Sequence, residues 1–211
     1  MKKYVSIDSI EYSYPSGYKV GPYSLTCDKG DILSFSGPSG VGKTTFLRIL
    51  AGLLKPDEGS FFLDQIPLNT LTDFIPTHKR KIGLVFQDYA LFPHLTVEQN
   101  ISFSFKVLNK KYTTKDIQNS LEQMCLGDVL HRYPYQLSGG QQQRVSLIRA
   151  LMAKPKFLLM DEPFASLDAD LREKVILETV KTLKEFNMTS LIVTHAPNEL
   201  APYVDRKVEI S

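Results

Sequence analysis

The sequence predicts an α/β fold built around a mostly parallel sheet, because short apolar runs alternate with segments of helical periodicity. The runs are continuous rather than alternating, which is typical of parallel strands covered on both faces. A chain of 211 residues is long enough for one well-buried domain with a subdomain, but not for two independent domains. The predicted strands are residues 32–35 (ILSF), 82–86 (IGLVF), 157–160 (FLLM) and 191–193 (LIV).

Helices are predicted between these strands. Residues 42–54 follow the first strand and end before the breaker pair Lys55-Pro56. Residues 141–153 precede the third strand and residues 169–186 follow it, and both carry apolar residues at helical spacing.

Two regions depart from this alternation. Residues 88–155 contain no convincing strand and predict an inserted helical subdomain. The first thirty residues and residues 60–63 (SFFL) predict short strands of a separate antiparallel edge sheet. We therefore predict a single domain in which residues 1–87 and 156–211 form the core.

Composition excludes several classes of function. A net charge of +2 is too small for a nucleic-acid-binding surface, so no nucleic acid partner is expected. Cys27 and Cys125 fit neither a metal motif nor a disulfide framework, and we expect reduced, buried or half-buried side chains. Asp8 and Glu11 interrupt any signal-peptide-like segment, and no apolar run approaches the roughly 20 residues needed to span a bilayer. A role at a membrane would therefore require a partner protein.

Every predicted core strand ends at a hydrogen-bonding or charged side chain. Because ligands bind beyond the carboxyl ends of the strands in open α/β sheets, these ends predict one shared active site. The residues at the four ends are Ser36-Gly37, Gln87, Asp161-Glu162 and Thr194-His195.

The stretch after the first strand, residues 37–44 (GPSGVGKT), fits the phosphate-binding pattern G-x-x-x-x-G-K-[ST]. Its glycines let successive N–H groups point at phosphates, and the following helix adds partial positive charge. Lys43 would place a full charge on the β and γ phosphates, and the Thr44 hydroxyl can bind Mg²⁺. A glycine-rich turn is the alternative, but the position between a strand and a helix favours phosphate binding. The predicted nucleotide-binding residues here are Gly37, Pro38, Ser39, Gly40, Val41, Gly42, Lys43, Thr44 and Thr45.

The pair Asp161-Glu162 is the natural partner of this loop. An Asp at a strand end can hold the Mg²⁺ shell, and a neighbouring carboxylate can polarise water for in-line attack on the γ-phosphate. Such a pair before Pro163 would by itself be more often a solvated loop, and the adjacent phosphate loop reverses that expectation. Gln87 and His195 are weak signals alone and gain from the same convergence.

A second glycine stretch, residues 137–141 (LSGGQ), begins a predicted helix. Ser138 and Gln141 have the spacing of a capping box, which accounts for these two residues. It does not account for Gly139 and Gly140, which weaken a helix start and are useful only where something approaches the backbone closely. This stretch is therefore predicted to be a second anion site.

Over about residues 14–195, these motifs and their order resemble the nucleotide-binding subunits of ATP-binding cassette (ABC) transporters. Tyr14 lies where this family places an aromatic ring that stacks on adenine, with Tyr12 as a rival. The matching motifs are Walker A (37–44), the Q-loop (Gln87), the signature (137–141), Walker B (157–162), the D-loop (165–168, ASLD) and the switch histidine (His195).

The resemblance implies a P-loop NTPase fold that binds ATP and Mg²⁺ and hydrolyses ATP. Two copies would pack head to tail, so that the signature of one copy closes over the ATP held by its partner. The implied catalytic residues are Lys43, Gln87, Glu162 and His195. The implied metal ligands are Thr44, Gln87 and Asp161. The implied further nucleotide contacts are Ser138, Gly139, Gly140, Gln141 and Asp168.

Residues 86–97 (FQDYALFPHLTV) and 161–164 (DEPF) resemble the importer branch for small anions, metals, vitamins and polyamines. This implies transmembrane permease subunits as partners, a solute-binding protein as an indirect partner, and a peripheral cytoplasmic position on the inner face of the cell membrane. In such subunits the segment after the Q-loop receives a permease helix. For Leu91, Phe92 and Leu95, ordinary burial in the helical subdomain is the alternative.

Three features depart from the family pattern. Ala196 follows the switch histidine where Asp is usual, which affects the hydrogen bonding around His195. The D-loop reads ASLD rather than SALD, a swap predicted to change little. The sequence ends at Ser211 without the C-terminal regulatory domain that many importers of this branch carry, which fits a short subunit or a truncated chain.

Other functions remain as alternatives. A soluble ABC ATPase of translation or repair would usually carry two cassettes or a long coiled-coil insertion, and this sequence has neither. A GTPase or small-molecule kinase would not need the LSGGQ stretch, and no guanine-recognition motif is present. A binding module without turnover would not need Glu162. An exporter subunit stays open, and the cargo cannot be read from this sequence.

Overall fold

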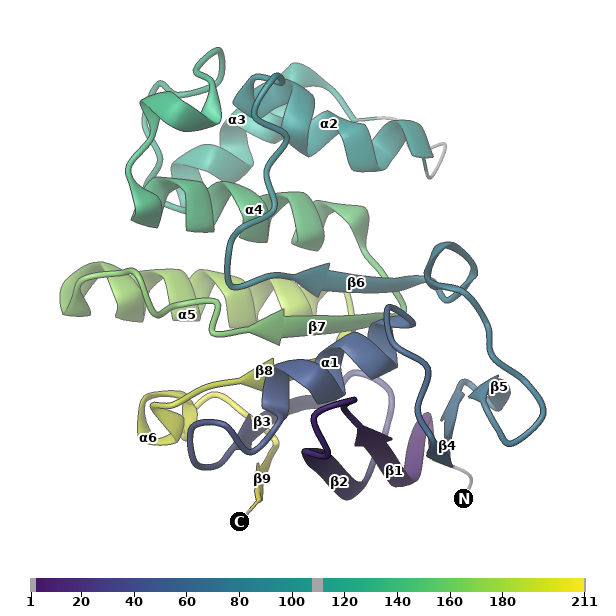
Figure 1. The fold of residues 1–211 in the computed structure, drawn as a ribbon. Coiled ribbons are helices and arrows are strands. Elements are labelled where there is room, and N and C mark those ends of the chain that lie inside the picture. The colour runs from purple at the N-terminus through teal and green to yellow at the C-terminus, as the bar shows by residue number, and fades with distance from the viewer. Residues whose placement is uncertain (1–2, 108–111, 211) are drawn as a thin grey trace.

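The computed structural model describes residues 3–107 and 112–210, in which a parallel sheet forms the centre of the molecule (Figure 1). Its strand order is β6-β7-β8-β3-β9, and every neighbouring pair is parallel. The middle strands are buried along their whole length, as their continuous apolar runs predict. The strands are β3 (Ile32–Ser36), β6 (Ile82–Val85), β7 (Phe157–Asp161), β8 (Thr189–Val193) and β9 (Arg206–Glu209).

An antiparallel sheet packs beside it, in the order β2-β1-β4-β5. The sequence predicted the N-terminal strands and β4 but not β5, which is short and half exposed. β4 and β5 are joined by Asp64 and Gln65, both with positive φ, the backbone of a two-residue hairpin turn that usually carries Asn or Gly. The strands are β1 (Val5–Ser13), β2 (Lys19–Cys27), β4 (Glu58–Leu63) and β5 (Ile66–Asn69).

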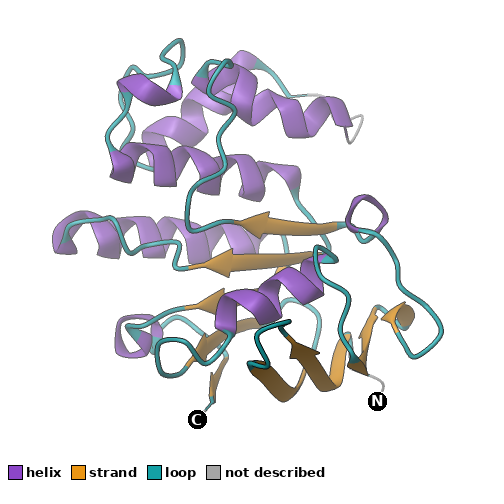
Figure 2. Ribbon diagram, viewed as in Figure 1, coloured by secondary structure: helices purple, strands orange, loops and turns teal. Residues whose placement is uncertain are grey.

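Helices cover the parallel sheet, and a further group of helices lies beyond its β6 edge. α1 (Lys43–Ala51), α5 (Ala169–Glu185) and the short α6 (Pro197–Leu200) follow β3, β7 and β8. Figure 2 shows the other three helices grouped beyond β6, with the arrowheads of β6 and β7 on the same side of the sheet. These helices are α2 (Val97–Val107), α3 (Thr114–Gln123) and α4 (Gly139–Ala153), and single 3-10 turns lie at Thr77–Lys79 and Pro134–Gln136.

Two apolar clusters hold these layers together. One joins α2, α3, α4 and α5 to one face of the parallel sheet. The other lies between the antiparallel sheet, α1 and the opposite face, where Phe35 stacks on Phe46 at 5.2 Å. Cys27 is buried as predicted, whereas Cys125 is exposed, so the expectation of burial is wrong for Cys125. Among the described residues, no helix is both long and apolar enough to cross a bilayer.

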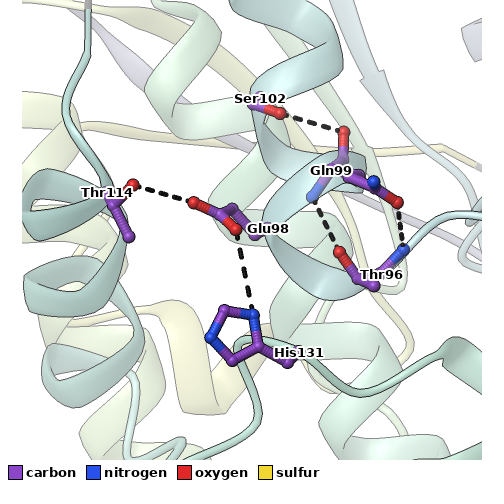
Figure 3. A network of polar contacts seen from close by, with 6 residues as sticks. All are labelled: Thr96, Glu98, Gln99, Ser102, Thr114 and His131. Atoms are coloured by element: carbon purple, nitrogen blue, oxygen red, sulfur yellow. Dashed lines mark hydrogen bonds and ion pairs between the residues drawn. The ribbon is translucent and has the colours of Figure 1, made fainter.

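Polar contacts tie α2 to its neighbours in the helical region (Figure 3). Glu98 accepts a hydrogen bond from the Thr114 hydroxyl at 2.8 Å, and its other carboxylate oxygen lies 3.9 Å from Nδ1 of His131. Thr96 and Gln99 bond reciprocally across the start of α2, as in a capping box. The Glu98 contacts join α2 to α3 and to the loop that leads to α4.

A buried arginine that the sequence analysis missed closes the end of α1. Arg80 is 2% exposed, and its guanidinium donates to the carbonyls of Ile49 and Leu50, at 3.0 and 2.9 Å, and to the Asn69 side chain at 2.6 Å. The last carbonyls of a helix lack the usual intrahelical partners, and Arg80 supplies donors to two of them; the Ile49 carbonyl also accepts from the Gly52 N–H at 2.9 Å. Burial lowers the pKa of Arg80 to about 10.

Replacing Arg80 by Ala should lower the free energy of unfolding by about 3 kcal/mol, since it takes the Arg80 donor from the Leu50 carbonyl and from the buried Asn69 side-chain oxygen. Urea denaturation followed by circular dichroism measures the loss. The exposed neighbour Lys79 provides the control, and Lys79→Ala should stay within about 0.5 kcal/mol of the unmodified protein. Equal stability of the two variants would contradict this role of Arg80.

Candidate functional site

A cavity of about 550 Å³ opens at the carboxyl ends of the parallel strands. It brings together Tyr14 and part of the predicted phosphate loop with both carboxylates, Gln87 and His195, whereas Gly37, Pro38 and Val41 of the loop do not line it. The predicted residues that line it are Tyr14, Ser39, Gly40, Gly42, Lys43, Thr44, Thr45, Gln87, Asp161, Glu162 and His195.

The loop between β3 and α1 is shaped as an anion cradle. Lys43 is buried at its base, and its ammonium donates to the carbonyls of Gly37 and Pro38, both at 2.8 Å. Gly42 has φ 103°, and a Cβ there would lie 2.5 Å from the Val20 side chain, so only glycine fits. Gly42 caps α1 without any side-chain bond, which leaves the first N–H groups of the helix available to a ligand.

Two tyrosines outside the motif hold the loop by its backbone carbonyls. The hydroxyl of Tyr18 donates to the carbonyl of Gly40, and that of Tyr23 donates to the carbonyl of Val41 at 2.6 Å. Because these carbonyls are held by the tyrosines, the intervening peptide cannot rotate freely. The sequence analysis missed both residues, and no local pattern could have revealed them, since their partners lie some twenty residues away.

Tyr14, and not its rival Tyr12, lines the cavity. The Tyr14 hydroxyl lies 2.7 Å from Oγ1 of Thr45, which anchors the ring beside the start of α1. Tyr12 packs edge-on against the Tyr14 ring at 4.9 Å and supports it from the side. Tyr18 is a second aromatic residue on the cavity wall.

The two carboxylates at the end of β7 are unusually buried, with Asp161 5% and Glu162 9% exposed. Burial raises the pKa of both groups, while Thr44 counteracts the rise at Asp161 and His195 counteracts it at Glu162. Glu162 Oε1 lies 3.4 Å from Nε2 of His195 and makes no hydrogen bond. A buried carboxylate with a raised pKa and a free oxygen can act as a proton acceptor in this cavity.

The turn around His195 accommodates the unusual Ala196. The Ala196 N–H donates to Oγ1 of Thr194 at 3.0 Å, so the preceding threonine holds the backbone here. His195 is left half exposed at the cavity edge, facing Glu162.

The donors Thr44, Gln87 and Asp161 also line an adjoining cavity together. A hydroxyl, an amide and one carboxylate suit Mg²⁺, which prefers oxygen ligands and takes one or two carboxylates together with substrate phosphates. Since Asp161 is buried beside Thr44 and Lys43, the residues present fit this ion. Within residues 3–107 and 112–210, no cluster of three or more His, Cys, Asp or Glu side chains is placed to hold a metal by itself.

The signature residues and Asp168 do not line the cavity. Ser138 and Gln141 form the predicted capping box at the start of α4, and Asp168 caps α5 by accepting from the N–H of Leu171 at 3.0 Å. In this chain Ser138, Gln141 and Asp168 are engaged in helix caps and not in the cavity wall.

The structure adds a second reason for glycine at one of the two signature positions. A Cβ at Gly140 would lie 3.0 Å from the carbonyl oxygen of Ser166, a tight contact with this chain's own D-loop. At Gly139 the nearest atom to such a Cβ is the Tyr89 hydroxyl, at an ordinary 3.4 Å. Of the two signature glycines, Gly139 therefore has the more space around its Cα for an approaching group.

Comparison with known protein families agrees with this site. The family model described as ABC transporter matches residues 20–165, more than half of the chain. The chain belongs to the ABC transporter family. The matched region includes the phosphate loop, both signature glycines and Asp161-Glu162, whereas Tyr14 and His195 of the cavity wall lie outside it.

Curated relatives of the cassette are similar along almost all of its length. PotA of Protochlamydia amoebophila, a spermidine/putrescine import ATP-binding protein, is 40% identical over 96% of this chain and 54% of its own. PotG of Escherichia coli, a putrescine transport ATP-binding protein, is 42% identical over 92% of this chain and 51% of its own. PhnT of Salmonella typhimurium, named for 2-aminoethylphosphonate import, is 38% identical over 96% and 54%. The chain spans about half the length of these relatives.

Solved structures confirm the fold of the cassette. The ATP-binding cassette MJ0796, in a dimeric post-hydrolysis state bound to ADP and Pi, superposes with a TM-score of 0.86 at 32% identity, covering 98% of this chain and 94% of its own. A second dimeric structure of MJ0796, described as a bacterial ABC transporter cassette, gives a TM-score of 0.85 at the same identity.

Proposed function

We propose that this chain is the ATP-binding and ATP-hydrolysing subunit of an ABC importer. The observation that carries the proposal is the single cavity in which the Lys43 loop meets Asp161, Glu162 and His195 at the ends of the parallel strands. Family membership and the import proteins among the relatives support it.

We assign the nucleotide contacts as follows. The loop N–H groups and the Lys43 ammonium bind the β and γ phosphates, and Tyr14 stacks on the adenine. When bound, Mg²⁺ neutralises phosphate charge, and the residues that would hold it are Thr44, Gln87 and Asp161.

Glu162 takes the role of general base in hydrolysis. Its buried position and raised pKa make it a better proton acceptor than a solvated glutamate, and its free oxygen can hold the attacking water. His195, 3.4 Å from that oxygen, orients Glu162 and the γ-phosphate.

We further propose that two copies pack head to tail. Ser138, Gly139, Gly140, Gln141 and Asp168 do not line their own chain's cavity, so we assign these motif residues to the nucleotide held by another copy. The dimeric state of the two similar cassettes supports this arrangement. The partner's γ-phosphate would approach Gly139, which has the more space around its Cα.

The importer would also need transmembrane permease subunits, which hold this subunit at the inner face of the cell membrane, and a solute-binding protein that acts indirectly. Residues 88–155 would form the helical subdomain that meets the permease, and residues 1–87 and 156–211 the nucleotide-binding core. Leu91, Phe92 and Leu95 are half-buried, so part of their surface stays available to a partner helix. The relatives named for polyamines and a phosphonate differ in cargo, so selection of the solute falls to the other subunits.

Mixing two inactive variants tests the head-to-tail assignment. Lys43→Ala spoils the phosphate loop, and Gly139→Asp puts a negative charge where the γ-phosphate must approach, at a position with space for the side chain. In a mixed dimer both lesions fall in one composite site, so the other site is intact. We expect ATPase activity to reappear on mixing and to rise faster than linearly with protein concentration.

The matched control mixes Lys43→Ala with Glu162→Gln. Both lesions lie at a chain's own nucleotide, so every composite site keeps one lesion and no activity should return. If the first mixture restores neither hydrolysis nor occlusion of one nucleotide per dimer, the trans role of the signature is wrong.

A further inference from the structure

A buried glutamine joins the signature helix to the turn that follows Glu162. Gln143 is 2% exposed and lies one helical turn into α4. Its Nε2 donates to the carbonyl of Glu162 at 2.9 Å, and its Oε1 accepts from the N–H of Ser166 at 3.1 Å. The Gln143 side chain therefore forms hydrogen bonds with the backbone at both ends of the turn from Glu162 to Ser166.

Ser166 carries further contacts of this junction. Its hydroxyl lies 2.7 Å from the Tyr89 hydroxyl, and its carbonyl oxygen is the atom that a side chain at Gly140 would meet. The carbonyl of Tyr89 in turn accepts from Arg149 of α4 at 3.1 Å. The segment after Gln87, the D-loop and α4 thus meet at one serine.

This contact corrects the expectation that the ASLD order changes little. In the usual SALD order, position 166 would carry alanine, which has no hydroxyl to offer Tyr89. The swap therefore creates a hydrogen bond between two motif segments.

We propose that Gln143 and Ser166 are positioning residues for hydrolysis, which set the place of Glu162 relative to the signature helix and the segment after Gln87. The proposal rests on the function proposed above for Glu162. Neither side chain lines the cavity, so each acts through the backbone that it holds.

The backbone at Glu162 gives a physical reason for such support. The backbone of Glu162 has φ 50°, a conformation that residues other than glycine rarely adopt. Contacts with the surrounding structure must therefore maintain it. Its N–H donates to the Val193 carbonyl at 3.1 Å, and its own carbonyl is held by Gln143. Removing the Gln143 amide leaves this carbonyl with only the longer bond from the Ala165 N–H, at 3.3 Å, so the carboxylate is less firmly placed in the cavity.

The test replaces Gln143 with Met, which keeps the length and volume of the side chain but loses both hydrogen bonds. We expect kcat for ATP hydrolysis to fall roughly 10-fold while the Kd for MgATP stays within about 2-fold. The variant should also accumulate as an ATP-dependent dimer, because binding is intact and hydrolysis is slowed. A structural defect alone would instead lower the fraction of protein that binds nucleotide.

A double-mutant cycle tests the second contact without disturbing the core. Ser166→Ala and Tyr89→Phe each remove one hydroxyl, so each should lower kcat by roughly 2- to 5-fold, and the double variant should be no slower than the slower single variant. The control is Tyr112→Phe, whose lost hydroxyl bonds the Met152 carbonyl at the far end of α4, and its kcat should be unchanged.

The outcomes separate this inference from the proposed function. If Glu162→Gln is inactive but Gln143→Met and Ser166→Ala turn over at the unmodified rate, the positioning role is wrong and the ATPase role stands. If Glu162→Gln keeps full activity, the proposed function fails first. If Gln143→Met does not fold, the double-mutant cycle on Ser166 and Tyr89 tests the positioning role. Additive effects of these two substitutions on kcat would contradict it.

Discussion

Replacing Glu162 by Gln should lower ATP hydrolysis by roughly 10²-fold or more, because an amide cannot take the proton of the attacking water. MgATP binding should be preserved, since the phosphate loop and Asp161 are untouched. The variant should then accumulate as an ATP-dependent dimer. Phosphate release assays and size-exclusion chromatography with and without ATP measure the two effects.

A surface glutamate supplies the matched control for this substitution. Glu58 is exposed on β4, away from the cavity, so Glu58→Gln should hydrolyse ATP at the unmodified rate. Turnover of Glu162→Gln at the same rate as Glu58→Gln would show that Glu162 is not the base.

Replacing Lys43 by Ala should weaken MgATP binding by roughly 10- to 100-fold, because hydrogen bonds to a charged group contribute about 1.5–3 kcal/mol. The Lys43 ammonium lies inside the loop on two carbonyls, ready to turn toward phosphate oxygens. Titration with a fluorescent nucleotide measures the affinity.

Lys55, exposed just beyond α1, is the control for this charge. Lys55→Ala removes the same charge from the protein without touching the loop, so its affinity should not change. Unchanged affinity of Lys43→Ala would mean that nucleotide phosphates bind elsewhere.

Most of the fold could be predicted from local patterns. β3, β7 and β8 were predicted because buried parallel strands need uninterrupted apolar residues. The predicted end of the first helix at residue 54 was wrong, since α1 ends at Ala51 and Gly52 turns back with φ 81°. Leu53 and Leu54 continue the apolar pattern beyond the helix, so the pattern alone could not mark that end.

The candidate site was predicted for a different reason. Parallel strands bring their carboxyl ends to one edge, so polar residues at those ends must lie near one another whatever the loops do. Gln87, Asp161, Glu162 and His195 follow from this rule. Arg80, Gln143 and Tyr23 were missed, since each bonds backbone groups remote in sequence and a lone polar residue carries no sign of such a partner.

The sequence by itself therefore determined the features that need only neighbouring residues. These are the phosphate loop, the capping box at Ser138 and the buried strands. Packing alone decided that Tyr14 rather than Tyr12 faces the cavity and that Gly140 serves this chain's own D-loop. It also decided that Ser166 reaches Tyr89. The physical reason is that these contacts require precise distances between segments separated by some twenty to eighty residues, and only the assembled core sets those distances.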